Sequence, residues 1–277
     1  MRKISSDADH SLKLFIRGGL GNQLFQFSGA FFYAKRFSAK LIVNETALVR
    51  HLDSSRQNWI SRLNISSVTE EMEVAWETDK RIQRSFHRKS FQNIEEDELA
   101  NLRTLKNNLS FRGWFQYSSY PTKLNIDKNA FFPLHIPEYV LQQTTEIKKS
   151  PEIAGIHMRF GDFKSTSWGT LSKDWYEKVF RKLEENGITH VHIFTDEIEV
   201  AREMISGISN KFSIEFPEVK RILDPDALLW ILRHYKTFVS SNSTLSWWAS
   251  YLNLNEDPVI YCPWGGNLYL EPWIKIE

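Results

Sequence analysis

The chain has 277 residues, which is enough for one large domain or two small ones. Hydrophobic residues make up 42% of it and charged residues 25%, a globular composition that excludes a mainly disordered protein. The 35 Lys and Arg residues nearly balance the 34 Asp and Glu residues, so a formal net charge of +1 provides no basic footprint for nucleic acid.

The cysteine content and the hydropathy of the sequence exclude further classes of protein. The single Cys262 rules out an intramolecular disulfide and a cysteine metal cluster. No apolar run approaches the ~18 residues of a transmembrane helix, and no signal peptide is recognisable. We therefore expect a soluble, cytoplasmic protein, with a trimmed ectodomain of a membrane-anchored enzyme as the alternative. Ten Trp residues can fill cores or bind sugars, and cores are the commoner use.

The first predicted elements are a strand at 12–16, a Gly-rich turn at 17–23 and a helix at 24–37. This layout lets backbone amides and a helix N-terminus approach an anion or a polar ligand. Tight strand-to-helix turns also need glycine for steric reasons alone. Asn22 either caps the helix or faces a ligand, and both interpretations stay open.

The region that follows is less regular. We expect a strand at 41–43, and no motif is recognisable over 46–108, where acceptor choice is expected to lie. A basic cluster at 80–89 precedes an acidic block at 95–98, a pattern typical of solvated helix faces. The alternative is a basic surface that meets an anionic membrane or a lipid-linked acceptor. The aromatic segment 111–120 indicates core packing or an aromatic wall beside a ligand.

From residue 153 onward, strands and helices alternate. We expect strands at 153–157, 191–195, 212–216, 238–240 and 259–261, and helices at 174–185, 200–205, 225–234 and 245–252. This alternation predicts a Rossmann-like unit with a parallel sheet and right-handed crossovers. The N-terminal half opens in the same way. The expected organisation is therefore two α/β domains, 1–150 and 151–277, divided near the polar segment 142–150.

Polar residues follow several predicted strands of the second half. His157, Arg159 and Asp162 follow the first strand, Asp196 follows the next, and a Ser-rich segment at 240–246 follows a later one. The carboxyl ends of parallel strands share one edge, where open α/β folds bind ligands. A guanidinium and the free N–H groups of a helix start both suit phosphate oxygens. We therefore predict a site for a phosphate-containing ligand.

Several interpretations of this edge remain open. His157 is a candidate base, or a histidine hydrogen-bonded within the core. Asp162 is the first choice for the base, or a partner of Arg159 or a turn cap. No P-loop motif is present, so P-loop hydrolysis is not expected. Asp224 followed by Pro225 indicates a helix N-cap with Pro at the first helical position rather than a metal ligand.

Six motifs occur in the order known from one enzyme family: Gly18-Gly19-Leu20-Gly21-Asn22-Gln23-Leu24-Phe25-Gln26, Gly113-Trp114-Phe115-Gln116, His157-Met158-Arg159-Phe160-Gly161-Asp162-Phe163, Phe194-Thr195-Asp196-Glu197, Ser241-Asn242-Ser243-Thr244-Leu245-Ser246-Trp247-Trp248-Ala249 and Pro272-Trp273-Ile274. Through them the chain resembles the bacterial-type family 11 α-1,2-fucosyltransferases from Gly18 to Ile274. The N-terminal and Ser-Asn-Ser motifs are specific when found together.

The resemblance implies a GT-B fold, with two Rossmann-like domains facing across a cleft, the acceptor side first and the donor side second. It implies inverting transfer of L-fucose from GDP-β-L-fucose to the 2-hydroxyl of a β-galactoside in a surface glycan. No metal or other cofactor is required. The implied partners are GDP-fucose and a free or lipid-linked glycan, with possible peripheral contact at the inner face of the membrane. The alternatives are transfer of another nucleotide sugar and non-catalytic binding of a nucleotide sugar or glycan.

The resemblance also implies roles for individual residues. The catalytic group comprises Arg159, Asp162 and His157. The donor-binding group comprises Arg159, Asp196, Asn242, Ser243, Thr244, Ser246, Gly19, Gly21 and Asn22. The acceptor-side group comprises Arg17, Asn22, Gln23, Trp114 and Gln116. No residue is implied as a metal ligand.

Two departures from the family pattern are visible. Phe160 stands where the family has a second Arg, which leaves one guanidinium at the phosphates. Gly265 and Gly266 stand where the family has an aromatic residue. The first departure bears on the choice of donor, and the second on how firmly the C-terminal segment is held.

Overall fold

The computed structural model describes residues 10–49, 57–69, 72, 74–77, 91–161, 169–208, 210–217 and 224–277. The chain divides into two compact units, Met1–Phe131 and Phe132–Glu277. This division comes earlier than the boundary at residue 150 that the sequence suggested. The reason is helix α7 (Glu138–Lys149), which packs against α10 (Pro225–Leu232) of the second unit.

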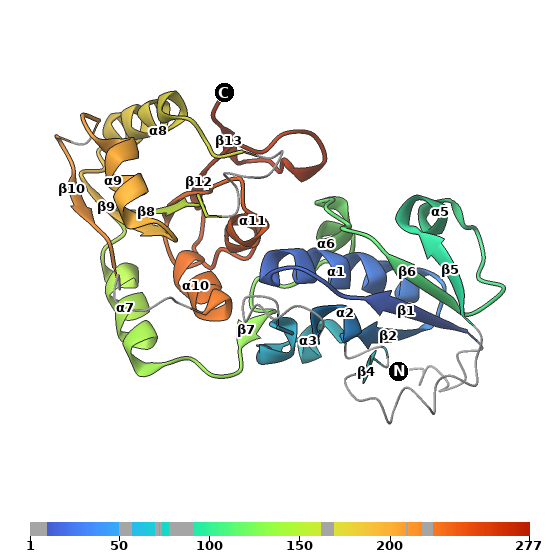
Figure 1. The fold of residues 1–277 in the computed structure, drawn as a ribbon. Coiled ribbons are helices and arrows are strands. Elements are labelled where there is room, and N and C mark those ends of the chain that lie inside the picture. The colour runs from blue at the N-terminus through green and yellow to red at the C-terminus, as the bar shows by residue number, and fades with distance from the viewer. Residues whose placement is uncertain are drawn as a thin grey trace. The chain divides into compact units, whose positions relative to one another are not determined.

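The first unit is built on a five-stranded parallel sheet with the order β4-β2-β1-β6-β5 (Figure 1). Its strands are β1 (Ser11–Phe15), β2 (Lys40–Asn44), β4 (Val74–Glu77), β5 (Gln92–Glu95) and β6 (Leu109–Arg112). Its helices and short elements are α1 (Leu20–Arg36), α2 (Thr46–Val49), η2 (Ile60–Arg62), β3 (Leu63–Asn64), α3 (Ser66–Thr69), α5 (Glu96–Asn101) and α6 (Ser119–Lys123).

Helix α1 is the main helix of this unit and packs on β1 and β2. It starts earlier than the predicted residue 24, because Gly19 takes the extended N-cap conformation and the polar residues before 24 form the first turn. Lys35 and Arg36 lie in the last turn, where positive charge suits the free carbonyls. The rings of Phe27 and Phe31 stack on each other with centroids 5.8 Å apart. Packing of this apolar face holds the turn before α1 in place.

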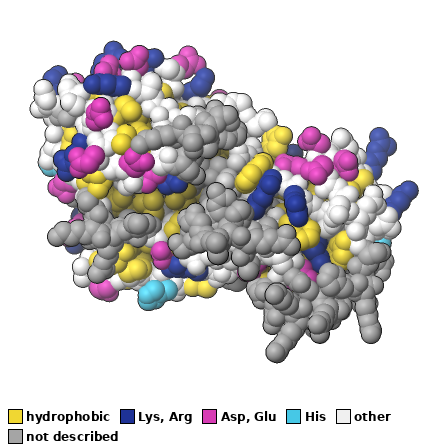
Figure 2. Space-filling model, in the orientation of Figure 1, with side chains coloured by type: hydrophobic (Ala, Val, Ile, Leu, Met, Phe, Trp, Pro, Cys, Tyr) yellow, Lys and Arg dark blue, Asp and Glu magenta, His cyan; other side chains and the backbone are white. Residues whose placement is uncertain are grey.

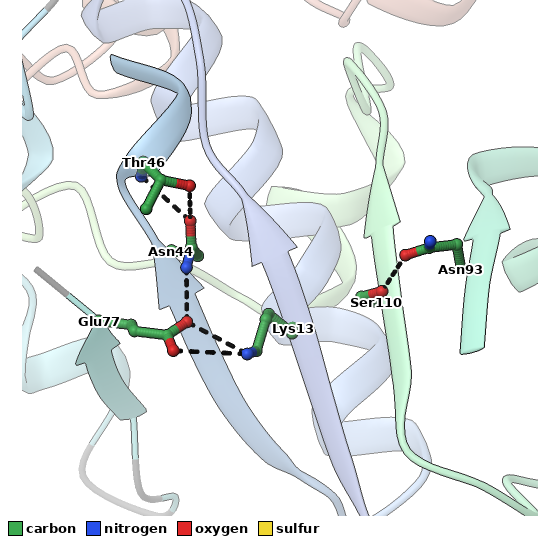
Figure 3. A network of polar contacts seen from close by, with 6 residues as sticks. All are labelled: Lys13, Asn44, Thr46, Glu77, Asn93 and Ser110. Atoms are coloured by element: carbon green, nitrogen blue, oxygen red, sulfur yellow. Dashed lines mark hydrogen bonds and ion pairs between the residues drawn. The ribbon is translucent and has the colours of Figure 1, made fainter. Parts of the chain in front are cut away.

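One polar network in the first sheet is largely buried (Figure 3). The Lys13 ammonium on β1 lies 3.2 Å from Glu77 Oε2 on β4, and Asn44 Nδ2 on β2 donates to the same oxygen at 2.5 Å. Asn44 Oδ1 accepts from the Thr46 backbone N–H at 3.0 Å. Removing one member of a buried ion pair leaves an uncompensated charge at a cost of about 3–5 kcal/mol. The network thus ties three strands together.

The second unit is built on a six-stranded parallel sheet with the order β10-β9-β8-β11-β12-β13 (Figure 1). Its strands are β7 (Phe132–Pro133), β8 (Ile153–Met158), β9 (His190–Thr195), β10 (Ser213–Glu215), β11 (Thr237–Val239), β12 (Val259–Cys262) and β13 (Ile274–Lys275). Its helical elements are α7, α8 (Lys173–Glu185), α9 (Ile198–Ile205), α10, α11 (Thr244–Tyr251) and η4 (Gly266–Leu268). The predicted alternation and parallel pairing are confirmed.

Strand β8 shows how the two faces of this sheet differ. Ile156 and Met158 belong to a buried cluster with residues of α8 and α9, such as Trp175. The alternating residues Gly155 and His157 contact residues that follow α10 and β11, because successive side chains point to opposite faces. A Cβ at Gly155 would lie 2.5 Å from the Tyr235 ring, so glycine is needed there.

The described surface agrees with the bulk composition. Basic and acidic side chains are interspersed over the visible face of the second unit (Figure 2), as the near-neutral net charge suggests. Within the described ranges, every helix falls short of the length and apolar character needed to cross a membrane. The basic cluster at 80–89, on which the hypothesis of membrane contact was based, lies outside the described residues.

Candidate functional site

Arg159 follows β8 at the carboxyl edge of the second sheet and is held by Asp196, which follows the adjacent strand β9. Arg159 Nη1 lies 2.9 Å from Asp196 Oδ2, and the two side chains are 35% and 23% exposed. Asp196 Oδ1 accepts the Phe160 backbone N–H at 3.0 Å. Both oxygens of Asp196 are therefore engaged within the protein, and the carboxylate fixes Arg159 at the edge.

The two residues after Arg159 make this contact possible. Phe160 turns its side chain into the core cluster beside Trp175 and is 1% exposed. Gly161 lies so close to Asp196 that a Cβ there would be 2.5 Å from Oδ2. Phe160 thus packs in the core, and Arg159 supplies the guanidinium at the carboxyl edge of the second sheet. Asp162, the first choice for the base, lies outside the described residues.

The Ser-rich loop between β11 and α11 is held by its own hydroxyl groups. The Ser241 N–H donates to Ser246 Oγ at 2.9 Å, and the Ser243 N–H donates to Ser241 Oγ at 3.3 Å. Asn242 Nδ2 donates to the Gly169 carbonyl at 2.9 Å. Ser246 is fully buried, so its hydroxyl faces the loop rather than a ligand. Ser243 and the neighbouring Thr244 are partly exposed.

Helix α11 begins in this loop, with Ser243 as its N-cap. The first N–H groups of a helix have no partner inside the helix, and the helix dipole favours negative charge there. The start of α11 and Arg159 both lie at the carboxyl edge of the same parallel sheet, on the adjacent strands β8 and β11. This edge therefore presents a cation and helix amides, a combination suited to phosphate oxygens.

His157 lies beneath the Ser-rich loop and is 3% exposed. Its Nδ1 is 3.2 Å from Ser241 Oγ. Burial first, and then the nearby Arg159 charge, lower the pKa of His157 to about 3. This geometry favours a histidine hydrogen-bonded within the core over a base, because the buried ring contacts the hydroxyl of Ser241.

The first unit carries a second polar edge, where β1 leads into α1. Gly18 has a φ of +79°, a conformation that favours glycine. A Cβ on Gly18 would lie 3.1 Å from Asn22 Nδ2 and 3.4 Å from the Trp114 ring. Gly19 is exposed and open to solvent, whereas Gly21 is buried in the first turn of α1. The turn therefore places residues from two segments around the start of α1.

Gln23 does not face a ligand in this structure, contrary to the expected acceptor-side role. It is 0% exposed. Its Nε2 donates to the carbonyls of Gly18 and Gln57, both at 2.8 Å. Its Oε1 accepts from the N–H groups of Trp59 and Ile60 at 3.0 and 3.2 Å. All its hydrogen-bonding capacity is used, so Gln23 fastens one loop to the turn.

Three other expected acceptor-side residues gather at this turn together with Asn22. The Arg17 guanidinium lies 4.1 Å from the centroid of the Trp114 ring, and Gln116 Nε2 donates to Asn22 Oδ1 at 3.0 Å. Asn22 is therefore not the helix cap, because that position belongs to Gly19. Trp114 is 43% exposed although its neighbour Phe115 is fully buried. The aromatic segment thus supplies both core packing and an exposed indole.

Glu96 is a residue of this site that the sequence did not suggest. Its Oε2 accepts the N–H groups of Trp114 and Phe115 at 2.9 and 3.0 Å. Burial raises the pKa of Glu96 despite these two hydrogen bonds. A Cβ at Gly113 would lie 2.4 Å from Glu96 Oε2, so glycine is needed there as well. Glu96 holds the loop that presents Trp114.

In the part of the chain that the structure describes, no group of three or more His, Cys, Asp or Glu residues could hold a metal ion. Cys262 is buried, and burial raises the pKa of its thiol to about 11. The described residues therefore offer two separate candidate sites, the polar sheet edge of the first unit and that of the second.

Comparison with known proteins finds relatives along the whole chain. No family model matches it. The chain is 22% identical over 302 residues to the O-antigen biosynthesis glycosyltransferase WbnK of Escherichia coli, an alignment that covers 94% of this chain and 99% of the relative. It is 24% identical over 298 residues to an α-1,2-colitosyltransferase of Escherichia coli, which covers 95% of this chain and 97% of the relative.

Solved structures show the same fold. POFUT1 in complex with GDP-fucose aligns with a TM-score of 0.59 at 13% identity, over 98% of this chain and 99% of that chain. The fucosyltransferase NodZ from Bradyrhizobium aligns with a TM-score of 0.54 at 13% identity, over 88% and 92%. The chain therefore has the GT-B fold of these proteins, as the family resemblance implied.

Proposed function

We propose that this protein is a glycosyltransferase that moves L-fucose from GDP-β-L-fucose to the 2-hydroxyl of a β-galactoside, with inversion. The observation that carries this proposal is the Arg159–Asp196 pair at the same sheet edge as the start of α11. It combines a fixed guanidinium with free helix amides, which suits a leaving diphosphate. The named relatives and the shared fold support the choice of a sugar nucleotide as the ligand.

The proposed step forms one bond and breaks one. The acceptor oxygen attacks the anomeric carbon of fucose, the bond from that carbon to the diphosphate oxygen breaks, and GDP leaves with the electron pair. Arg159 and the first amides of α11 neutralise the charge that develops on GDP. Ser243 and Thr244 lie at the same helix start as further donors. Asp196 keeps Arg159 in position, and His157 supports the loop through Ser241.

The first unit is proposed to bind the acceptor. The exposed Trp114 offers an indole face of the kind that packs on the apolar side of a pyranose, and Asn22 and Gln116 lie in the same cluster as hydrogen-bonding partners for sugar hydroxyls. The acceptor is a β-galactoside in a surface glycan, free or lipid-linked. A base takes the proton of the acceptor hydroxyl. We assign no described residue to this role, and Asp162 remains the candidate that the sequence analysis suggested.

A second candidate donor is a nucleotide-linked colitose. Two observations favour it as the alternative. One of the two Escherichia coli relatives is an α-1,2-colitosyltransferase by name. Phe160 lies in the core, so the chain has one guanidinium where the family that it resembles has two. This difference bears on the choice of donor. Colitose is fucose without its 3-hydroxyl, so the same phosphate-binding edge serves either donor.

The test is GDP release from GDP-fucose by the purified full chain over a panel of β-galactosides. We expect release that depends on the acceptor. Arg159→Ala should lower kcat by about 10²–10³, the effect of removing one donor to developing negative charge. Arg181→Ala is the matched control, since Arg181 is exposed on α8 of the same unit. Absence of GDP release with every acceptor, or near-normal activity of Arg159→Ala, contradicts the proposal.

The remaining alternatives are separated by two further measurements. Calorimetry with a panel of nucleotide sugars identifies the preferred donor, and tighter binding of GDP-colitose than of GDP-fucose selects the second candidate. A single-turnover reaction with enzyme in excess distinguishes transfer from binding alone. If the donor binds and stays intact with every acceptor, the protein is a non-catalytic binder of nucleotide sugars.

A further inference from the structure

Arg17 is an immobilised cation at the carboxyl edge of the first sheet. Its backbone N–H donates to Gln26 Oε1 at 3.0 Å, and its carbonyl accepts from Gln26 Nε2 at 2.8 Å. Its guanidinium lies 4.1 Å from the centroid of the Trp114 ring. Glu96 accepts the backbone N–H of Trp114, so side-chain hydrogen bonds hold the main chain at both partners of this stacked pair.

The charge of Arg17 is not balanced within the described part of the protein. Among the described residues, no carboxylate forms an ion pair with Arg17, and its Nε is buried without a hydrogen-bond partner. Arg159 and Lys13 behave differently, since each is paired with a carboxylate. The neighbouring Glu96 directs its Oε2 to two backbone N–H groups instead. A fixed guanidinium with free donors is suited to a carboxylate or phosphate of a ligand.

We propose that Arg17 and Trp114 form a subsite for an anionic group on the acceptor, so that the acceptor is an acidic glycan rather than a neutral one. This inference rests on the proposed function. The anionic group is either the carboxylate of a uronic acid next to the galactose or the phosphate of a lipid-linked glycan. The indole packs on a sugar ring while the guanidinium binds the anion through two parallel N–H bonds.

The experiment compares acceptors that differ in one charge. The first pair is lactose and galactosyl-β-1,4-glucuronic acid, which differ by a hydroxymethyl against a carboxylate. The second pair is a β-galactosyl disaccharide on a short-chain lipid diphosphate and on the matching lipid alcohol. For each pair the ratio of kcat/KM for the charged acceptor to that for the neutral acceptor is measured with GDP-fucose. We expect a ratio of at least about ten in one pair, the value of a charge-assisted hydrogen bond.

Variants assign this preference to Arg17. Arg17→Gln should bring the ratio close to one, and Arg17→Lys should give an intermediate ratio because the ammonium keeps the charge without the planar fork. Arg103→Gln is the matched control, since Arg103 is an exposed arginine of the same unit that follows α5, away from the end of β1. It should keep the wild-type ratio. The preference should also fall as salt is raised from about 0.05 to 0.5 M.

The outcomes separate this inference from the proposed function. Transfer with a ratio near one in both pairs, or a high ratio that Arg17→Gln leaves unchanged, overturns the anionic subsite and leaves the fucosyltransferase proposal intact. Absence of transfer to all four acceptors counts against the proposed function. In that case ligand-detected NMR of the four acceptors tests the anionic subsite without transfer. The subsite predicts that a charged acceptor binds wild type more tightly than it binds Arg17→Gln.

Discussion

Replacing Asp196 with Asn tests how the donor edge is built. The substitution removes the charge that holds Arg159 at 2.9 Å and keeps an amide oxygen for the Phe160 N–H. The two side chains are 35% and 23% exposed, so solvent screening reduces the ion pair to about 1 kcal/mol. If that energy orients the guanidinium in the transition state, kcat falls about fivefold. GDP affinity should not weaken, because Arg159 keeps its charge.

The assay is steady-state GDP release together with calorimetry of GDP binding. Glu197→Gln removes the same charge at the next residue and serves as the control. An unchanged kcat in Asp196→Asn refutes the idea that Asp196 positions Arg159. Weaker GDP binding with an unchanged kcat refutes it in another way, because it indicates direct contact between Asp196 and the nucleotide, as the sequence analysis suggested.

Three further predictions follow from individual contacts. A Cβ at position 161 would lie 2.5 Å from Asp196 Oδ2, so Gly161→Ala should displace the Asp196 carboxylate and lower kcat as Asp196→Asn does. The double variant should show no further loss of kcat, and additive losses would contradict a shared contact. Burial lowers the pKa of His157 from 6.5 to about 3, so the stability that the neutral ring contributes is lost as the pH falls from about 6.5 towards 3. In urea titrations, His157→Gln should reduce the fall in the free energy of unfolding over this pH range. An unchanged fall would refute the buried neutral state of His157. Burial raises the pKa of Glu96 from 4.5, so the ionised carboxylate costs stability once the pH rises past the raised pKa. Glu96→Gln should therefore be at least as stable as wild type at pH 7. Glu96→Ala removes the acceptor of the part-buried Phe115 N–H and should lose about 1–3 kcal/mol, and the reverse order of stabilities would be evidence against this role of Glu96.

The sequence predicted the architecture well where hydrophobic periodicity is strong. The strands and helices from residue 153 onward are confirmed, as is Asp224 at the N-cap of α10 with Pro225 next to it. The start of α1 was misplaced because its first turn contains glycine and polar residues that are typical of loops. Periodicity reports which face of an element is buried, and it does so least clearly at the ends of elements.

The site could be predicted only as a set of residues near an edge. Gln23 and Asn22 are adjacent polar residues in one motif, yet Gln23 is buried with four hydrogen bonds and Asn22 is partly exposed. Glu96 lies in an acidic block that indicates a solvated helix face, which holds for the exposed Asp97 and Glu98 but not for Glu96. The Asp196–Arg159 pair joins residues far apart in sequence. Such orientations depend on tertiary contacts that no local pattern encodes.

The most direct test of the proposed function is the glycosidic linkage of the product. The full chain is incubated with GDP-fucose and lactose or another β-galactoside, and the product is analysed by NMR for the anomeric configuration and for the galactose carbon that carries fucose. The product should carry an α-L-fucosyl group on the 2-hydroxyl of galactose. Fucose on another hydroxyl, a β-linked product, or no transfer to any galactoside would contradict the proposed function.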